Sequence, residues 1–145
     1  MSHSLLVIRV QTFEVAIEAG LVREIVGART WVPVPGARVE LPGVVAWGGR
    51  AVAMLDIARV VPGLRPLAPG EQRPRALIVD VHDSVLAVPS DWVSEVRVVA
   101  DDKLGPRAVH EFALARAEVD FGDAVVPLLD PRLLLDRSGD DAAGA

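Results

Sequence analysis

The sequence predicts an all-β fold made of two similar small lobes, and three observations support this. Val, Leu, Ala and Ile dominate the 51% of hydrophobic residues, whereas Phe and Trp occur three times each and Tyr is absent. The 12 glycines and 11 prolines separate short apolar runs, which is typical of strands joined by turns. An internal repeat then divides the 145 residues into halves, each too small for a generous core of its own.

The first segments predict a β-hairpin. Residues 5–10 form an apolar run broken only by Arg9, as expected of a strand buried on both faces. Residues 13–18 alternate between large apolar side chains and glutamate or alanine, the pattern of a strand with one wet face. Residues 21–25 fit either a short helix or a bent strand.

A Pro/Gly-rich segment and a second hairpin follow. Residues 31–43 predict a loop with at most a short strand at residues 39–41. The apolar segments 44–47 and 50–55 flank Gly48-Gly49, which predicts a tight turn with positive φ. Asp56 then has the position of an N-cap for a short helical turn through Val61, and residues 62–74 read as a linker.

The second half repeats this order. Residues 77–81 and 85–88 flank His82-Asp83-Ser84 and predict a hairpin, which residues 93–98 are expected to continue. Residues 113–119 and 124–129 predict a third hairpin. Asp130-Pro131 predicts a short helix through Leu135, with the aspartate as cap and the proline at the first helical position. Residues 138–145 are expected to be disordered.

The internal repeat is visible in aligned segments. A shift of 71 residues places Leu6–Val10 on Leu77–Val81 and Val22–Ile25 on Val93–Val96. A shift of 74 places Val52–Asp56 on Val126–Asp130. We expect a single domain over residues 1–137, with lobe one at about 13–74, lobe two at about 75–136, and strand 5–10 shared between them.

Composition excludes several classes of protein. The net charge of −5 and a pI near 5.1 argue against nucleic-acid binding. The chain has no cysteine, which excludes disulfides and thiolate chemistry. It lacks a signal-peptide pattern and any apolar run near the roughly 20 residues that span a bilayer. We expect a cytoplasmic protein that does not insert into membranes.

Catalytic and metal-binding patterns are scarce, so neither catalytic residues nor cofactors nor metals are predicted. His3, His82 and His110 show no ligand spacing and are expected to be ordinary exposed residues. Asp56 and Asp130 could form a carboxylate pair, but their places between a strand and a short helix favour capping.

Exposed side chains are more informative. Trp31, Trp47 and Trp92 are each expected near a loop or strand end, where they either close the lobes or anchor a partner. Glu24, flanked by Val22 and Ile25, would give a polar contact within apolar surface, although a solvated glutamate is the default.

The ordered motifs resemble the CheW family, the coupling proteins of bacterial chemotaxis arrays, from about Leu5 to Leu135. The residues that carry the resemblance are Phe13-Glu-Val-Ala-Ile17, Val22-Arg-Glu-Ile25, Val32-Pro33 with Pro35, Leu41-Pro-Gly-Val44, Arg50-Ala-Val-Ala-Met-Leu-Asp56, Asp91-Trp-Val-Ser-Glu-Val96 and Leu128-Leu-Asp130. The resemblance implies two pseudo-symmetric, five-stranded, SH3-like β-barrels with short helices around a common core. It also implies binding to the regulatory domain of a CheA-type histidine kinase and to chemoreceptor cytoplasmic tips.

By this resemblance, Val22, Glu24 and Ile25 belong to a partner-binding surface, to which we add Trp47 and Arg50. The family usually has Asn-Leu-Arg-Gly in the hairpin where this chain has Ala46-Trp47-Gly48-Gly49. The family's arginine is thus replaced by Gly48, and Arg50 lies two residues further along.

The leading hypothesis is therefore a non-enzymatic chemosensory adaptor, either coupling kinase to receptors or acting as an accessory member that binds only one of them. The alternative is a small-ligand-binding β-barrel, which requires a lined cavity where the Val/Leu pattern predicts a filled core. A hydrolase that uses Asp56 or Asp130 is the weakest hypothesis.

Overall fold

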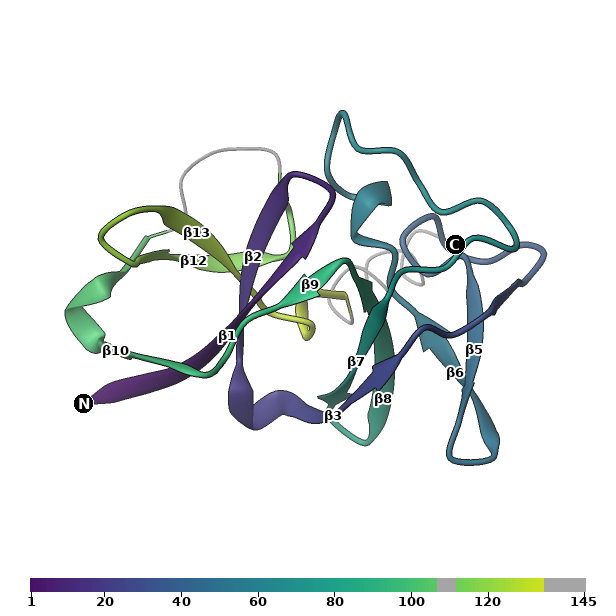
Figure 1. The fold of residues 1–145 in the computed structure, drawn as a ribbon, viewed down its shortest axis with the longest axis horizontal. Coiled ribbons are helices and arrows are strands. Elements are labelled where there is room, and N and C mark those ends of the chain that lie inside the picture. The colour runs from purple at the N-terminus through teal and green to yellow at the C-terminus, as the bar shows by residue number, and fades with distance from the viewer. Residues whose placement is uncertain (107–111, 135–145) are drawn as a thin grey trace, which may run out of the picture.

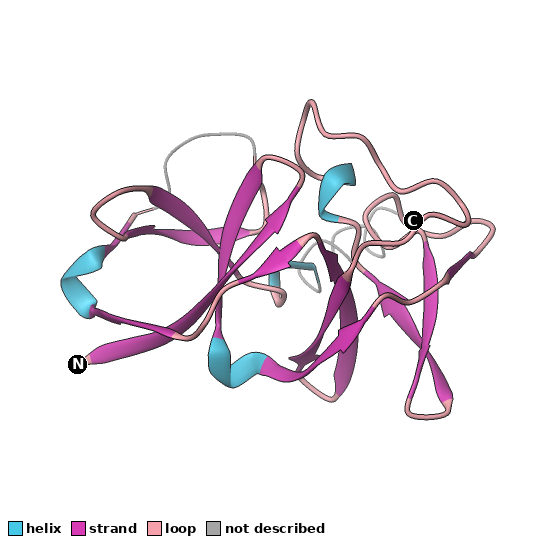
Figure 2. Ribbon diagram, in the orientation of Figure 1, coloured by secondary structure: helices cyan, strands magenta, loops and turns pink. Residues whose placement is uncertain are grey.

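A computed structural model describes residues 1–106 and 112–134, and these residues form mainly β-strands (Figures 1 and 2). The strands are β1 (Ser2–Val10), β2 (Phe13–Glu18), β3 (Val22–Gly27), β4 (Trp31–Pro33), β5 (Gly43–Trp47), β6 (Arg50–Met54), β7 (Arg75–Val81), β8 (Ser84–Ser90), β9 (Trp92–Val93), β10 (Arg97–Ala100), β11 (Leu104–Gly105), β12 (Ala115–Asp120) and β13 (Val125–Leu129). Three short 3-10 turns are η1 (Ala19–Leu21), η2 (Ile57–Arg59) and η3 (Asp101–Lys103).

The strands form two sheets that lie side by side (Figure 1). The seven-stranded sheet has the order β10-β1-β2-β13-β12-β11, with β9 also paired to β1. The six-stranded sheet has the order β3-β7-β8-β6-β5-β4. The all-β prediction is confirmed. The described pairings close neither sheet, and the strand numbers differ from the five expected for each barrel.

Strand pairing follows the internal repeat residue by residue. The parallel pair Leu128↔Ala16 joins β13 to β2, and the parallel pair Met54↔Ala87 joins β6 to β8. These positions are related by the shifts seen in the sequence, since 87 − 16 = 71 and 128 − 54 = 74. The antiparallel partners Val22↔Val79 and Ile8↔Val93 are also related by 71. The two halves therefore have equivalent strand pairings.

The halves exchange their first hairpins, which the expected lobe boundaries did not anticipate. Hairpin β1–β2 joins β12 and β13 of the second half, whereas hairpin β7–β8 joins β5 and β6 of the first half. The six-stranded sheet thus uses residues 22–90, and the seven-stranded sheet uses residues before and after them. The boundary expected at residue 74 does not separate the sheets, because period-two patterning identifies a strand without identifying its partner.

Three local expectations are corrected or resolved. Residues 22–25 lie in a bent strand rather than a helix, because the β3–β7 register shifts between Val22 and Glu24, while Leu21 ends the 3-10 turn η1. The strand expected at residues 39–41 is wrong, and the short strand of this segment is β4. Residues 93–98 do not continue the β7–β8 hairpin, since both β9 and β10 pair with β1.

Turn and cap predictions are confirmed where the residues are described. Gly48 and Gly49 have φ values of 58° and 75° in the β5–β6 turn. The Asp56 carboxylate accepts the Ala58 N–H at 3.2 Å, and the Asp130 carboxylate accepts the Arg132 N–H at 3.0 Å. The end of the predicted helix at Leu135 and the tail 138–145 lie outside the described residues.

The core consists of one shared cluster and one smaller cluster for each sheet. The shared cluster includes Ile8 and Ile17 from the seven-stranded sheet and Leu77 and Val88 from the six-stranded sheet. Each of these side chains is at most 1% exposed. Burying such a side chain contributes about 1.5–3 kcal/mol, so the interface between the sheets is a main source of stability.

The long segment 62–74 has no regular strand, as predicted, but it is fixed to the rest of the protein. The Gln11 side chain donates to the Arg65 carbonyl at 2.8 Å and accepts the Arg65 N–H at 3.0 Å. Arg65 pairs with Glu71 at 2.8 Å, and Arg73 pairs with Asp91 at 3.1 Å. The Gln11 bonds hold the segment against the β1–β2 turn, the Arg65–Glu71 pair lies within the segment, and the Arg73 pair holds its end against Asp91.

Candidate functional site

Strand β3 presents one edge of the six-stranded sheet, because β7 is its single partner among the described strands. The bulge after Val22 turns several side chains outward, and Ile25 is 45% exposed. Glu24 is also exposed. Val22 is half-buried and packs against the shared core instead. The predicted residues on β3 therefore divide into an exposed pair and one core-facing valine.

Trp47 connects the β5–β6 hairpin to this edge strand. Its Nε1–H donates to the Glu24 Oε1 at 2.7 Å, while its ring packs against the small core of the six-stranded sheet. Strands β3 and β5 are not neighbours in the sheet order, so the bond fixes two separate elements to each other. An exposed carboxylate is thereby held in one orientation at the border of an apolar surface.

Arg50 completes a row of three side chains. Its guanidinium carbon lies 5.7 Å from the Trp47 ring centre, a cation–π contact. Among the described residues, no carboxylate forms an ion pair with it. We call the surface of Glu24, Ile25, Trp47 and Arg50 the β3–β5 face. It carries one anchored negative charge and one available positive charge around an indole.

The tip of the β5–β6 hairpin carries Gly48, the residue that replaces the family's usual arginine. Gly48 has φ = 58°, a conformation that a residue with a Cβ adopts at a cost. The tip therefore presents backbone only, and the positive charge of this region comes from Arg50, beyond the turn.

Sequence reasoning missed an apolar depression. This depression lies on the other side of β4 and β5, because Val32, Val44 and Ala46 alternate along these strands with the core-facing Trp31, Val45 and Trp47. It has a volume of about 380 Å3, and its lining includes Val32, Val44, Ala46 and Arg50. Val32 is 60% exposed and pairs with Val44 across β4 and β5. The strand was missed because Pro33 and Pro35 closely follow Val32, and the three residues from Trp31 to Pro33 show no alternation of apolar and polar side chains.

The other tryptophans have different roles. Trp31 is 4% exposed and donates its Nε1–H to the Ala68 carbonyl at 3.1 Å, so it is not an exposed residue but closes the core of the six-stranded sheet, the first of the two alternatives. Trp92 is 44% exposed, with the Arg9 guanidinium 4.8 Å from its ring centre. Trp92 lies in the seven-stranded sheet and is not part of the β3–β5 face.

The two candidate catalytic aspartates are structural caps. Asp56 is 1% exposed, and its carboxylate accepts the N–H groups of Ala58 and Leu67 and the Arg59 Nε–H. Burial raises the pKa of Asp130, but hydrogen bonds and charge from Arg132 outweigh it, so that this pKa lies below its ordinary value. Both carboxylates are occupied by local donors.

The histidines and acidic residues of the described chain are dispersed. Over residues 1–106 and 112–134, His, Asp and Glu nowhere gather in groups of three that could hold a metal ion. The Nε2 of His3 contacts the Asp101 carboxylate at 2.5 Å, and His82 lies in the β7–β8 turn. His110 lies outside the described residues. Within that part of the chain, no helix has the length and apolarity needed to cross a bilayer.

The fold is similar to that of a protein of known structure. A solved structure of the scaffolding protein TtCheW from Thermoanaerobacter tengcongensis is similar, with a TM-score of 0.77, 15% sequence identity and coverage of 92% of each chain. No curated protein matches the sequence significantly. The model of the CheW-like domain family matches residues 4–139, nearly the full length. The chain therefore belongs to the CheW-like domain family.

Proposed function

We propose that this protein is a non-enzymatic chemosensory adaptor of the cytoplasm that binds the regulatory domain of a CheA-type histidine kinase through the β3–β5 face. The observation that carries this proposal is the 2.7 Å bond between Trp47 and Glu24. It preorients an exposed carboxylate beside exposed apolar side chains, the combination that protein interfaces use for affinity and register.

The division of labour on this face follows from its chemistry. Ile25 and the half-buried Trp47 ring offer apolar area to bury. Glu24 and Arg50 offer opposite charges at different positions, which favour a partner with the complementary arrangement. Because Glu24 is already anchored by Trp47, little side-chain entropy is lost when a partner binds it.

The kinase is tested by titrating the protein with the regulatory domain of the CheA-type kinase encoded by the same organism. We expect the wild type to bind and Glu24→Lys to bind at least about ten-fold more weakly. Glu95→Lys is the matched control, because Glu95 is the repeat equivalent of Glu24 (24 + 71 = 95), is also exposed and lies outside the β3–β5 face. Absence of wild-type binding, or equal losses in both variants, would contradict the proposed site.

A receptor is the second proposed partner. Family membership supports receptor binding, whereas Gly48 in place of the family's arginine favours an accessory protein that binds the kinase alone. A titration with a receptor cytoplasmic tip separates the two versions. Binding of both partners indicates a coupler, and kinase binding alone indicates the accessory role.

A further inference from the structure

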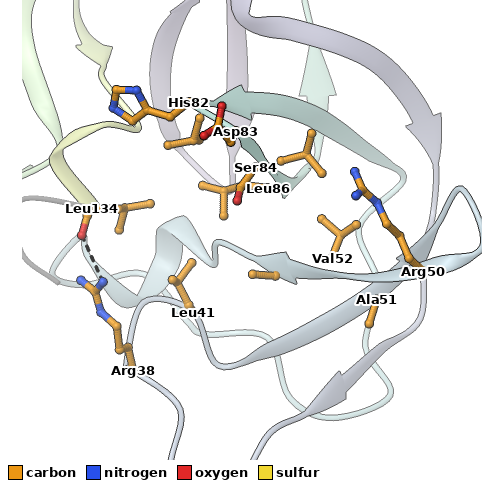
Figure 3. Close-up of a pocket in the computed structure, with 13 residues that line it drawn as sticks. Arg38, Leu41, Arg50, Ala51, Val52, His82, Asp83, Ser84, Leu86 and Leu134 are labelled. Atoms are coloured by element: carbon orange, nitrogen blue, oxygen red, sulfur yellow. Dashed lines mark hydrogen bonds between the residues drawn. The ribbon is translucent and has the colours of Figure 1, made fainter.

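We propose a second docking site, a cleft between β6 and β8 that accepts an extended, acidic peptide segment of a partner protein as an added strand. The two strands are parallel and pair only at Ala53↔Leu86 and Met54↔Ala87. Towards their N-terminal ends they separate, and the opening has a volume of about 570 Å3 (Figure 3). This cleft goes beyond the kinase-binding function, and among the residues that define the β3–β5 face only Arg50 also lines it.

Backbone groups at the opening have no strand partner within residues 1–106 and 112–134. The Leu55 N–H donates to the Ala87 carbonyl at 2.8 Å, so odd-numbered residues of β6 and β8 turn their backbone groups towards each other. The same alternation points the backbone of Ala51 and the N–H of Val85 into the cleft. Both positions lie beyond the last bridge of the β6–β8 ladder. An extended peptide could take up these groups, as in strand addition to a sheet edge.

Side chains of the cleft define the chemistry of the peptide. The floor is apolar, with Leu41, Leu86 and Leu134 among its lining residues. Arg38 and Arg50 lie at opposite ends of the opening in Figure 3. Arg38 donates to the Leu134 carbonyl at 3.1 Å and pairs with Glu40, and Asp83 also lines the cleft at the β7–β8 turn. Arg50 has no ion-pair partner among the described residues, so the carboxylate of the peptide is expected at the Arg50 end. A bound strand in which apolar and acidic residues alternate would therefore place its apolar side chains on the floor of the cleft and direct a carboxylate to Arg50.

The test uses a terminally blocked peptide, acetyl-Val-Asp-Val-Asp-Val-amide, titrated into the isotopically labelled full chain to its solubility limit. Backbone amide NMR signals report the binding site directly and do not depend on the kinase. We expect saturable shifts centred on Ala51 and Val85, weakened by added salt. The counterpart acetyl-Val-Lys-Val-Lys-Val-amide should produce no saturable shift.

Two variants test the two contributions separately. Arg50→Glu should weaken the aspartate peptide at least about ten-fold, whereas Arg75→Glu, an exposed arginine at the start of β7, should leave it unchanged. Ala51→Pro removes one N–H that faces the cleft, while Arg50 and Val52 keep their pairing with β5. This variant should bind the aspartate peptide more weakly at both low and high salt concentration, because the lost contact is a backbone hydrogen bond.

Several outcomes would overturn the proposal. These are no saturable shift at Ala51 and Val85, equal binding of the lysine peptide, or equal losses in Arg50→Glu and Arg75→Glu. Shifts that depend on protein concentration without any peptide would assign the cleft to a second copy of the chain instead. If Ala51→Pro fails to fold, the Arg50→Glu comparison and the lysine peptide still decide.

Discussion

At the scale of single residues, the Trp47–Glu24 pair links stability to binding. Trp47→Phe keeps an aromatic ring in place but removes the donor to Glu24. We expect a loss of about 0.5–1.5 kcal/mol in the free energy of unfolding and weaker kinase binding, because Glu24 is no longer oriented. Urea denaturation and titration with the kinase domain measure the two effects. Trp92→Phe is the control, and equal kinase affinity of Trp47→Phe and wild type would contradict the prediction.

Asp56 is the residue on which the largest single polar effect is expected. Asp56→Ala leaves the N–H groups of Ala58 and Leu67 without their acceptor in a buried site. We expect the free energy of unfolding to fall by about 3 kcal/mol. Asp130→Ala, which removes the equivalent cap of the second half, should cost about 1 kcal/mol because its partner Arg132 is largely exposed. Thermal unfolding of both variants tests the order, and equal losses would argue against it.

At the scale of elements, the segment 62–74 provides a pH-dependent prediction. Hydrogen bonds from Arg65 and from the Ala68 N–H lower the pKa of Glu71 from 4.5 to about 2. A carboxyl whose pKa is lowered by folding stabilises the fold above its ordinary pKa, and this contribution disappears as the pH falls through about 2. We expect an NMR titration to show Glu71 ionised at pH 3, and a pKa that rises with salt because the pair is exposed. An ordinary Glu71 pKa at low salt would show that the Arg65–Glu71 pair does not form in solution.

The β4–β5 pair depends on one close approach. A Cβ on Gly43 would lie 2.7 Å from the Trp31 ring and would collide with the Val32 carbonyl oxygen. We expect Gly43→Ala to destabilise the protein by about 2 kcal/mol or more, because backbone must move. Gly27→Ala, at a position with open space, is the matched control. Equal melting temperatures of the two variants would contradict this.

The same elements show what the sequence could and could not predict. The hairpins at Gly48-Gly49 and at residues 82–83 were predictable, since turn chemistry and flanking alternation act locally. Strand β4 was not, because it depends on the indole of Trp31 reaching the Ala68 carbonyl, 37 residues away. The bond between Trp47 and Glu24 was likewise missed, although both residues were candidates, because it joins strands that are not neighbours.

At the scale of the whole molecule, the shared core makes the two sheets a single cooperative unit. The cluster around Ile8 and Leu77 takes residues from both sheets, so neither sheet keeps its buried face when the other unfolds. We expect far-UV circular dichroism and tryptophan fluorescence to give one coincident urea transition. Leu77→Ala should lower the free energy of unfolding by about 2–5 kcal/mol, and the circular dichroism and fluorescence transitions should move together. Two separate transitions would contradict a shared core.

The exchanged hairpins also set the order in which the protein can be completed during synthesis. Every strand of the six-stranded sheet has left the ribosomal catalytic centre once residue 90 is added, whereas β2 must wait for β13, which ends at residue 129. Those 39 residues (129 − 90) take about 2–8 s at typical translation rates. During that interval the β1–β2 hairpin has an open edge. Two nascent chains on neighbouring ribosomes of one messenger RNA can then pair with each other through these edges.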